Sequence, residues 1–295
     1  MRRLRLLLIV FFLIVFAVFM ASNIHEYLTS DYSAPEITAD SPVLQLSVNA
    51  TDEELLAGMR ATDNLDGDVT RSLVVVSKSK FIARNTRNIN YAAFDGNNNV
   101  GTFTRKLVYT DYHAPRFELL QPLRFVSGNS SYDYLRNIRA YDCLDGNISS
   151  QIKITFADKE IAGESTTTQL INLLVTNSAG DSSALQLVAT FEDYDSFSKA
   201  SPGLSNYIIY VKPGEKPNLR SYLDGVWSAG NTRRFSDLGF DPDTDVSIDD
   251  SKVDYNTPGV YTAYYKLSKL AASANGTFRT SFGTTSLVIV VEDVQ

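Results

Sequence analysis

An internal duplication constrains this chain more than any other feature of its sequence. Three segments of a first copy match, in the same order, three segments that lie 79 to 82 residues further along. The matched pairs are Ser30–Pro35 with Thr110–Pro115, Ala61–Thr70 with Ala140–Ser149, and Asp95–Asn99 with Asn177–Asp181. Ordered matches at nearly equal offsets predict two modules of about 80 residues that arose by duplication.

Short apolar runs inside each copy have the character of β-strands. They are rich in Val, Ile, Leu, Thr, Phe and Tyr and are bounded by Gly, Asn and Asp. The expected strands are Arg71–Ser77, Ile89–Phe94, Thr102–Tyr109, Gln151–Phe156, Thr168–Thr176 and Ala184–Phe191. Thr51–Met59 is the one short helix expected, opened by a Thr or Asp cap. The pattern predicts an all-β chain of tandem β-sandwiches, because a twisted sheet must cover its apolar face with another.

The last hundred residues keep the strand rhythm but lack a good match to the duplicated loop. Strands are expected at Tyr207–Lys212, Val260–Leu267 and Ser286–Glu292, with insertions or long loops at Asn231–Asp250 and Ser268–Gly283. These features indicate a third, divergent copy. The predicted organisation is a stub and membrane helix over 1–30, followed by sandwich domains over 31–110, 111–195 and 196–295.

The amino terminus has the form of a membrane-targeting segment. Leu6–Ala21 is an unbroken apolar run of 16 residues, and Arg2, Arg3 and Arg5 precede it. Because positive charge stays in the cytoplasm, we expect a single-pass signal anchor with a cytoplasmic amino terminus and extracellular domains. The alternative is a secretory peptide that is cleaved after Ala17.

Composition excludes several kinds of site. Cys143 is the single cysteine, and it is accompanied by only two histidines, so neither an internal disulfide nor a Cys/His zinc centre can form. The net charge is −7, and residues 1–30 hold three arginines and one glutamate, which leaves −9 for the rest. Such an acidic surface repels phosphate backbones and argues against a nucleic-acid partner.

The motifs together resemble the bacterial immunoglobulin-like repeats of pesticidal crystal proteins, which are similar to hyalin repeats. The likeness covers residues 31–295 in three copies. It rests on the linkers Asp31–Pro35 and Asp111–Pro115, the segment Ala61–Asp68, the hairpin Asp95–Asn99, the turn Thr257–Tyr261 and the closing strand Val288–Asp293. The resemblance implies tandem immunoglobulin-like sandwiches that serve outside the cell as a stalk or adhesive module, generally without catalysis.

The duplicated Asp-Gly loop is the candidate metal site. Several oxygen donors lie within six residues in each copy, as calcium prefers. The candidate ligands are Asp63, Asp66 and Asp68 in the first copy and Asp142, Asp145 and Asn147 in the second. Asp95, Asn97 and the linker residue Asp31 or Asp111 are natural additional donors. The competing interpretation is a plain turn, since Asp-Gly is a strong turn signal.

No constellation of residues predicts an enzyme, since a Ser/His/Asp triad would have to use His113, which falls in a linker, and no histidine lies near Cys143 in the sequence. We therefore expect a non-catalytic, membrane-anchored stalk or adhesion rod with a protein or glycan partner. The alternative is an accessory ligand-binding subunit of an envelope or secretion complex that binds through the third domain. Aromatic residues crowd that domain, namely Trp227, Tyr255, Tyr261, Tyr264 and Tyr265.

Overall fold

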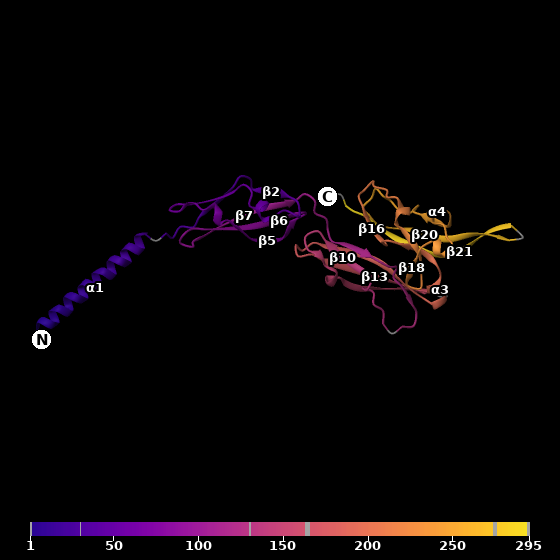
Figure 1. Ribbon diagram of the computed structural model, residues 1–295, viewed down its shortest axis with the longest axis horizontal. Helices are drawn as coiled ribbons and strands as arrows, with labels where there is room; N and C mark the ends of the chain where they lie inside the picture. Colours follow the sequence, from indigo (N-terminus) through magenta and orange to yellow (C-terminus); the bar gives the residue numbers. More distant parts are fainter. Residues whose placement is uncertain (1, 30, 130, 163–165, 274–275, 294–295) are drawn as a thin grey trace. The chain divides into compact units, whose positions relative to one another are not determined.

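The structure is a computed structural model that describes residues 2–29, 31–129, 131–162, 166–273 and 276–293. The chain divides into two compact units, Met1–Tyr112 and His113–Gln295. One long helix precedes a series of small β-sheets (Figure 1). The expected fold class, tandem immunoglobulin-like β-sandwiches after an apolar amino-terminal helix, is confirmed.

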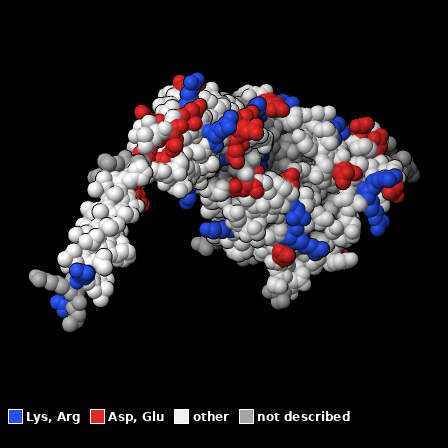
Figure 2. Space-filling model, turned by 60° about the vertical axis from the view of Figure 1, so that its left-hand side comes forward, with Lys and Arg blue, Asp and Glu red and all other residues white. Residues whose placement is uncertain are grey.

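The helix α1 spans Arg2–Thr29 and is apolar around its whole circumference. Its segment Arg3–Glu26 has 24 residues and contains an 18-residue window with a mean hydropathy of 2.9 and no buried part. Such a segment is about 36 Å long, which is enough to cross the ~30 Å hydrocarbon core of a bilayer. Figure 2 shows its middle free of charged side chains and basic residues at its far end.

The first unit contains one sandwich made of a three-stranded and a four-stranded sheet. The three-stranded sheet has the order β1-β3-β4, and the other has the order β2-β7-β6-β5 with β2 parallel to β7. The elements are β1 Glu36–Ala39, β2 Val43–Leu46, α2 Asp52–Leu55, β3 Met59–Asp63, β4 Gly67–Asp68, η1 Thr70–Ser72, β5 Val74–Ala83, β6 Thr86–Phe94 and β7 Val100–Tyr109. The strands expected from the sequence lie within or beside the observed ones.

Alternation along the strands builds the core of this sandwich. Ile89, Tyr91 and Ala93 on β6 are fully buried. The hydroxyl of Tyr91 donates a hydrogen bond of 2.8 Å to the carbonyl of Leu55, the buried residue of α2. Thr51 caps α2 in a capping box, as the sequence indicates. The short helix therefore closes one part of the core and is anchored there by Tyr91.

The second unit begins with a sandwich of the same topology. Its sheets have the orders β11-β10-β8 and β12-β13-β14-β9, with β9 parallel to β14. The elements are β8 Arg116–Leu119, β9 Arg124–Val126, β10 Ile138–Asp142, β11 Gly146–Asn147, η2 Ser149–Gln151, β12 Lys153–Ala162, β13 Thr166–Thr176 and β14 Ser182–Glu192. The duplication seen in the sequence is thus a duplication of strand pairing.

The third segment repeats this arrangement once more. Its sheets have the orders β15-β17-β18 and β16-β21-β20-β19, with β16 parallel to β21. The elements are α3 Tyr194–Ser198, β15 Ser201–Leu204, β16 Ile208–Val211, η3 Leu219–Tyr222, β17 Leu223–Ser228, β18 Asn231–Arg233, η4 Ser236–Leu238, α4 Pro242–Asp245, β19 Val246–Asp249, β20 Gly259–Ser273 and β21 Gly276–Val291.

The expected loop at Ser268–Gly283 is wrong for the described residues, which extend the hairpin of β20 and β21. Ser268 pairs with Ser281, and Ser273 pairs with Gly276. The segment is rich in small and polar residues, so it lacks the apolar alternation of a strand. Backbone hydrogen bonds between the two strands hold the hairpin without that signal.

The second and third sandwiches belong to one unit and share one hydrophobic core. That core joins residues such as Phe117 and Ile171 of the second sandwich to Tyr207 and Ile289 of the third. The third sandwich begins near residue 195, but it belongs to the same compact unit as the second.

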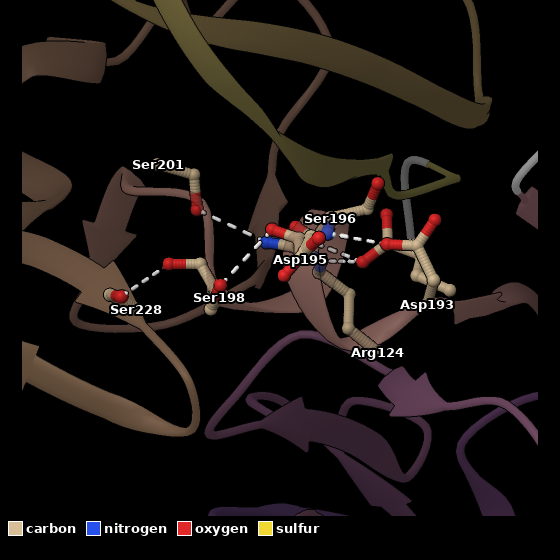
Figure 3. Close-up of polar contacts among 8 residues, drawn as sticks. Arg124, Asp193, Asp195, Ser196, Ser198, Ser201 and Ser228 are labelled. Atoms are coloured by element: carbon tan, nitrogen blue, oxygen red, sulfur yellow. Dashed lines mark hydrogen bonds and ion pairs between the residues drawn. The ribbon is translucent and has the colours of Figure 1, made fainter.

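Arg124 on β9 links these two sandwiches. Its guanidinium donates to Glu192 Oε2 over 2.9 and 2.6 Å and to the Ser196 carbonyl over 2.9 Å. A longer bond of 3.4 Å reaches Ser201 Oγ on β15 (Figure 3). The same group lies 4.6 Å from the ring centroid of Trp227 on β17, within cation–π range. One half-buried arginine therefore connects strands of both sandwiches.

Candidate cation site

Three aspartates converge in the first sandwich: Asp31, Asp63 and Asp95. One carboxylate oxygen from each lies within 4.8 Å of those of the other two. Asp31 precedes β1, Asp63 ends β3 and Asp95 directly follows β6, so the three come from distant parts of the sequence. Their exposed fractions are 7%, 9% and 8%. The sandwich therefore buries three acidic side chains side by side.

The surrounding loops hold these carboxylates through backbone hydrogen bonds. Asp63 Oδ1 accepts from the N–H groups of Leu65 and Asp66 over 2.9 and 3.0 Å. The Asp66 bond, followed by the Leu65 bond, holds the pKa of Asp63 below its ordinary value, so the group stays ionised at neutral pH. Asp31 Oδ1 accepts from the N–H of Ser33 over 2.9 Å. Asp95 differs, because its Oδ1 accepts from the N–H groups of Asn97 and Asn99 and its Oδ2 accepts from Asn99 Nδ2.

The remaining oxygens of two of these groups have no hydrogen-bond donor. Asp31 Oδ2 and Asp63 Oδ2 are buried and accept no hydrogen bond from the residues that the structure describes. Within the same residues, no lysine or arginine forms an ion pair with any of the three aspartates. Burying a carboxylate without a partner is costly. The cluster therefore has the donor chemistry and the charge of a site for a hard cation.

Only one of the three candidate ligands in the first copy belongs to this cluster. Asp63 contributes, whereas Asp66 Oδ2 accepts from the N–H of Gly96 over 2.6 Å. Asp68 Oδ1 accepts from the N–H of Thr70 over 2.9 Å, and hydrogen bonding to Thr70 lowers the pKa of Asp68. The carboxylate of Asp66 is therefore used by the neighbouring 95–99 loop, and that of Asp68 by its own loop.

Of the four additional donors expected from the sequence, two join the cluster and two make other hydrogen bonds. Asp31 and Asp95 join the cluster, whereas the side chain of Asn97 donates to the Asp31 carbonyl over 3.4 Å. Asp111 accepts from Ser47 Oγ and from the N–H of Val48 over 2.6 and 2.8 Å. The linker aspartate that meets the cluster is therefore Asp31.

In the second copy, both oxygens of the corresponding aspartate, Asp142, accept hydrogen bonds. Asp142 Oδ1 accepts from the N–H groups of Leu144 and Asp145, as Asp63 does in the first copy. Its second oxygen accepts a hydrogen bond of 3.0 Å from Nδ2 of Asn177, which stands where the first copy has Asp95. The amide supplies a donor and carries no charge.

The two remaining candidate ligands of the second copy also have hydrogen-bond donors, one from a neighbouring loop and one from their own loop. Asp145 accepts from the N–H and the hydroxyl of Ser178 over 2.6 and 2.7 Å. Asn147 Oδ1 accepts from the N–H of Ser149 over 3.0 Å. In this copy, hydrogen bonds from protein groups satisfy the side-chain oxygens of the turn.

The aromatic residues of the third sandwich lie mostly in its core. Trp227, Tyr255 and Tyr265 are buried. The hydroxyl of Tyr265 donates to the carbonyl of Leu219 over 2.7 Å, and burial is the main cause that raises the tyrosine pKa. Tyr264, in contrast, is exposed.

Tyr264 lines a half-open groove of about 620 Å³ in the second unit. The walls come from both sandwiches of that unit. They include Arg124, Val188 and Glu192 from the second sandwich and Val260, Tyr264 and Thr285 from the third. The groove therefore offers apolar and charged groups together, and its volume is that of a small-ligand site.

A phage protein is similar to this chain in sequence. No family model matches this chain. A protein of Acholeplasma phage L2, described as an uncharacterized 81.3 kDa protein, is 23% identical over an alignment of 277 residues, and the match covers 88% of this chain. The chain spans about a third (33%) of the length of that protein.

Solved structures that match this chain at a low level of similarity include two mammalian proteins and a bacterial one. Human desmocollin-1 is 10% identical, with 90% of this chain and 62% of that chain covered and a TM-score of 0.20. Mouse cadherin-23 is 9% identical, with 88% and 99% covered and a TM-score of 0.21. A structure of CBM51-2 with INT domains from Clostridium perfringens ZmpB is 13% identical, with 88% and 44% covered and a TM-score of 0.21. The fold assignment rests on the strand pairing described above, because these scores are low.

Proposed function

We propose that this chain is a non-catalytic, membrane-anchored protein whose immunoglobulin-like sandwiches serve outside the cytoplasm as a stalk or an adhesion and interaction rod. The observation that carries this proposal is the exposed apolar segment Arg3–Glu26, which leads within ten residues into the first strand of a sandwich. A helix that is apolar on every face is stable in lipid and poorly soluble in water. The arginines at its start favour a cytoplasmic amino terminus.

His113 and Cys143 are used in contacts within the second unit. His113 Nδ1 lies 2.9 Å from the carbonyl of Ala114, and the thiol of Cys143 donates to the carbonyl of His113 over 3.2 Å. These contacts support a structural role for both side chains. They agree with a protein that acts by binding and spacing.

Cysteine labelling in intact cells tests the topology. Because Cys143 is the single cysteine, Cys143→Ser gives a background without thiols, and Leu65→Cys adds one at an exposed position. We expect a membrane-impermeant maleimide to label the Leu65→Cys protein in intact bacterial cells. Labelling only after lysis contradicts an extracytoplasmic first sandwich.

The mass of the protein recovered from washed membranes distinguishes an anchor from a cleaved signal. An anchored protein keeps residues 1–30 and resists extraction at alkaline pH. A product that starts after Ala17 and appears in the soluble fraction contradicts the anchor and leaves the extracytoplasmic location intact.

The groove of the second unit favours a second candidate, an accessory subunit that binds a protein or glycan ligand. Val188, Val260 and Tyr264 are 52%, 53% and 47% exposed there. Tyr264→Ala should weaken retention of the full chain on a glycan array or on envelope components, whereas Tyr194→Ala changes an exposed tyrosine outside the lining. Equal retention of both variants and the original protein argues against this candidate.

A further inference from the structure

We propose that Asp31, Asp63 and Asp95 bind one calcium ion, and that this ion fastens the segment that follows the amino-terminal helix to the first sandwich. The starting observation is the pair of buried oxygens, Asp31 Oδ2 and Asp63 Oδ2, that lack a donor among the described residues. Both side chains are more than nine-tenths buried, and both contribute to the three-aspartate cluster.

The separation of the oxygens fits a single calcium ion. Calcium–oxygen distances are about 2.3–2.6 Å, so two ligands on opposite sides of one ion lie at most about 5 Å apart. The three carboxylates each offer an oxygen within 4.8 Å of the others. One ion can therefore touch all three with little movement of the loops.

The charge of the cluster also favours calcium over other cations. Three carboxylates carry a charge of −3 when ionised, and a divalent ion reduces this to −1. Magnesium usually keeps several waters and binds through one or two carboxylates, whereas calcium accepts six to eight oxygen ligands in flexible geometry. A buried set of three protein carboxylates is thus more typical of calcium.

The second copy provides an internal comparison. There, Asn177 replaces Asp95 and donates to the otherwise free oxygen of Asp142. In the second sandwich an amide donates to the aspartate of this loop, whereas in the first sandwich three carboxylates meet there. This difference is the expected one if the first sandwich binds a cation and the second does not.

The position of Asp31 gives the ion a mechanical role. Asp31 is the second residue after α1 ends at Thr29, and its carbonyl accepts a hydrogen bond of 2.9 Å from Asn99 Nδ2. Asn99 also donates to Asp95 Oδ2 over 2.7 Å. An ion shared by Asp31, Asp63 and Asp95 adds ionic bonds to this contact and limits the motion of the linker on the sandwich.

Calorimetry and melting of the full chain in detergent micelles test the proposal. We expect calcium chloride, added after treatment with a chelator, to bind once per chain and to raise the melting temperature of the first unit. The rise is about 10–20 °C when free calcium is a hundredfold above Kd. Magnesium chloride should give a much smaller rise. Hydrogen exchange in residues 31–35 should slow when calcium is present.

The decisive variant is Asp63→Asn, because the oxygen that it replaces accepts no hydrogen bond. The variant should therefore fold and melt within a few degrees of the original protein in chelator, yet show no heat of calcium binding and no calcium-induced rise. Asp142→Asn is the matched control at the equivalent position of the second copy. It loses the bond from Asn177 and should keep the full calcium response.

Three results overturn the proposal. One is the absence of both heat and a melting shift in the original protein. Another is a calcium response in Asp63→Asn equal to that of the original protein. The last is the loss of the calcium response in Asp142→Asn. A response to magnesium as large as that to calcium also contradicts the choice of ion.

Discussion

Replacing Arg124 with alanine should destabilise the second unit strongly. Arg124 and Glu192 are only 14% and 13% exposed, and their closest atoms lie 2.6 Å apart. Removing the arginine leaves Glu192 buried without its cation, which costs about 3–5 kcal/mol. For a unit of this size each kcal/mol lowers the melting temperature by about 2–4 °C, so we expect a fall of about 6–20 °C.

Arg116 provides the matched control for this measurement. It also donates two hydrogen bonds to a glutamate, one to each carboxylate oxygen of Glu292, but their side chains are 35% and 26% exposed. An ion pair with that much access to water contributes at most about 1 kcal/mol, so Arg116→Ala should lower the melting temperature by only a few degrees.

Differential scanning calorimetry of the full chain in detergent measures both variants. The double variant Arg124→Ala with Glu192→Ala should recover part of the loss, because it removes the unpaired charge. If Arg124→Ala costs no more than Arg116→Ala, the argument that burial makes this pair important is refuted.

Three further substitutions or conditions give measurable outcomes. Gly101→Ala places a Cβ 2.0 Å from the carbonyl oxygen of Pro35, so the first unit should lose more than about 2 kcal/mol in denaturant unfolding. Burial raises the pKa of Tyr207 to about 12. The folded state therefore favours its neutral form, and its contribution to stability is present below pH ~10 and lost as the pH rises towards ~12. Alkaline melting curves should show this loss, and Tyr207→Phe should reduce it. Thr51→Ala removes the cap of α2 and should cost about 1 kcal/mol, measured by thermal melting.

Much of the candidate site can be predicted from the sequence because its loop is encoded locally. The Asp-Gly turn places Asp63 Oδ1 on the next backbone N–H groups, and such short-range bonds depend on neighbouring residues alone. Its other oxygen is different. Whether it meets Asp31 and Asp95 or, as in the second copy, an amide depends on loops that are distant in the sequence.

Asp66 and Asp68 stay outside the cluster because of one distant and one local contact, respectively. Both are suitable oxygen donors by type and spacing, and both are used by the N–H groups of Gly96 and Thr70. The contact with Gly96 joins loops that are 30 residues apart, so the local spacing could not reveal it.

Periodicity and duplication in the sequence were enough to define the helix, most strands and the repeated module. Strands such as Thr102–Tyr109 alternate because the side chains of a strand point to opposite faces, and this signal is local. Tertiary contacts alone decided that residues 113–295 share one core, that Arg124 links its two sandwiches, and that three aspartates meet in the first sandwich. These features depend on the spatial order of strands, and burial in three dimensions selects that order.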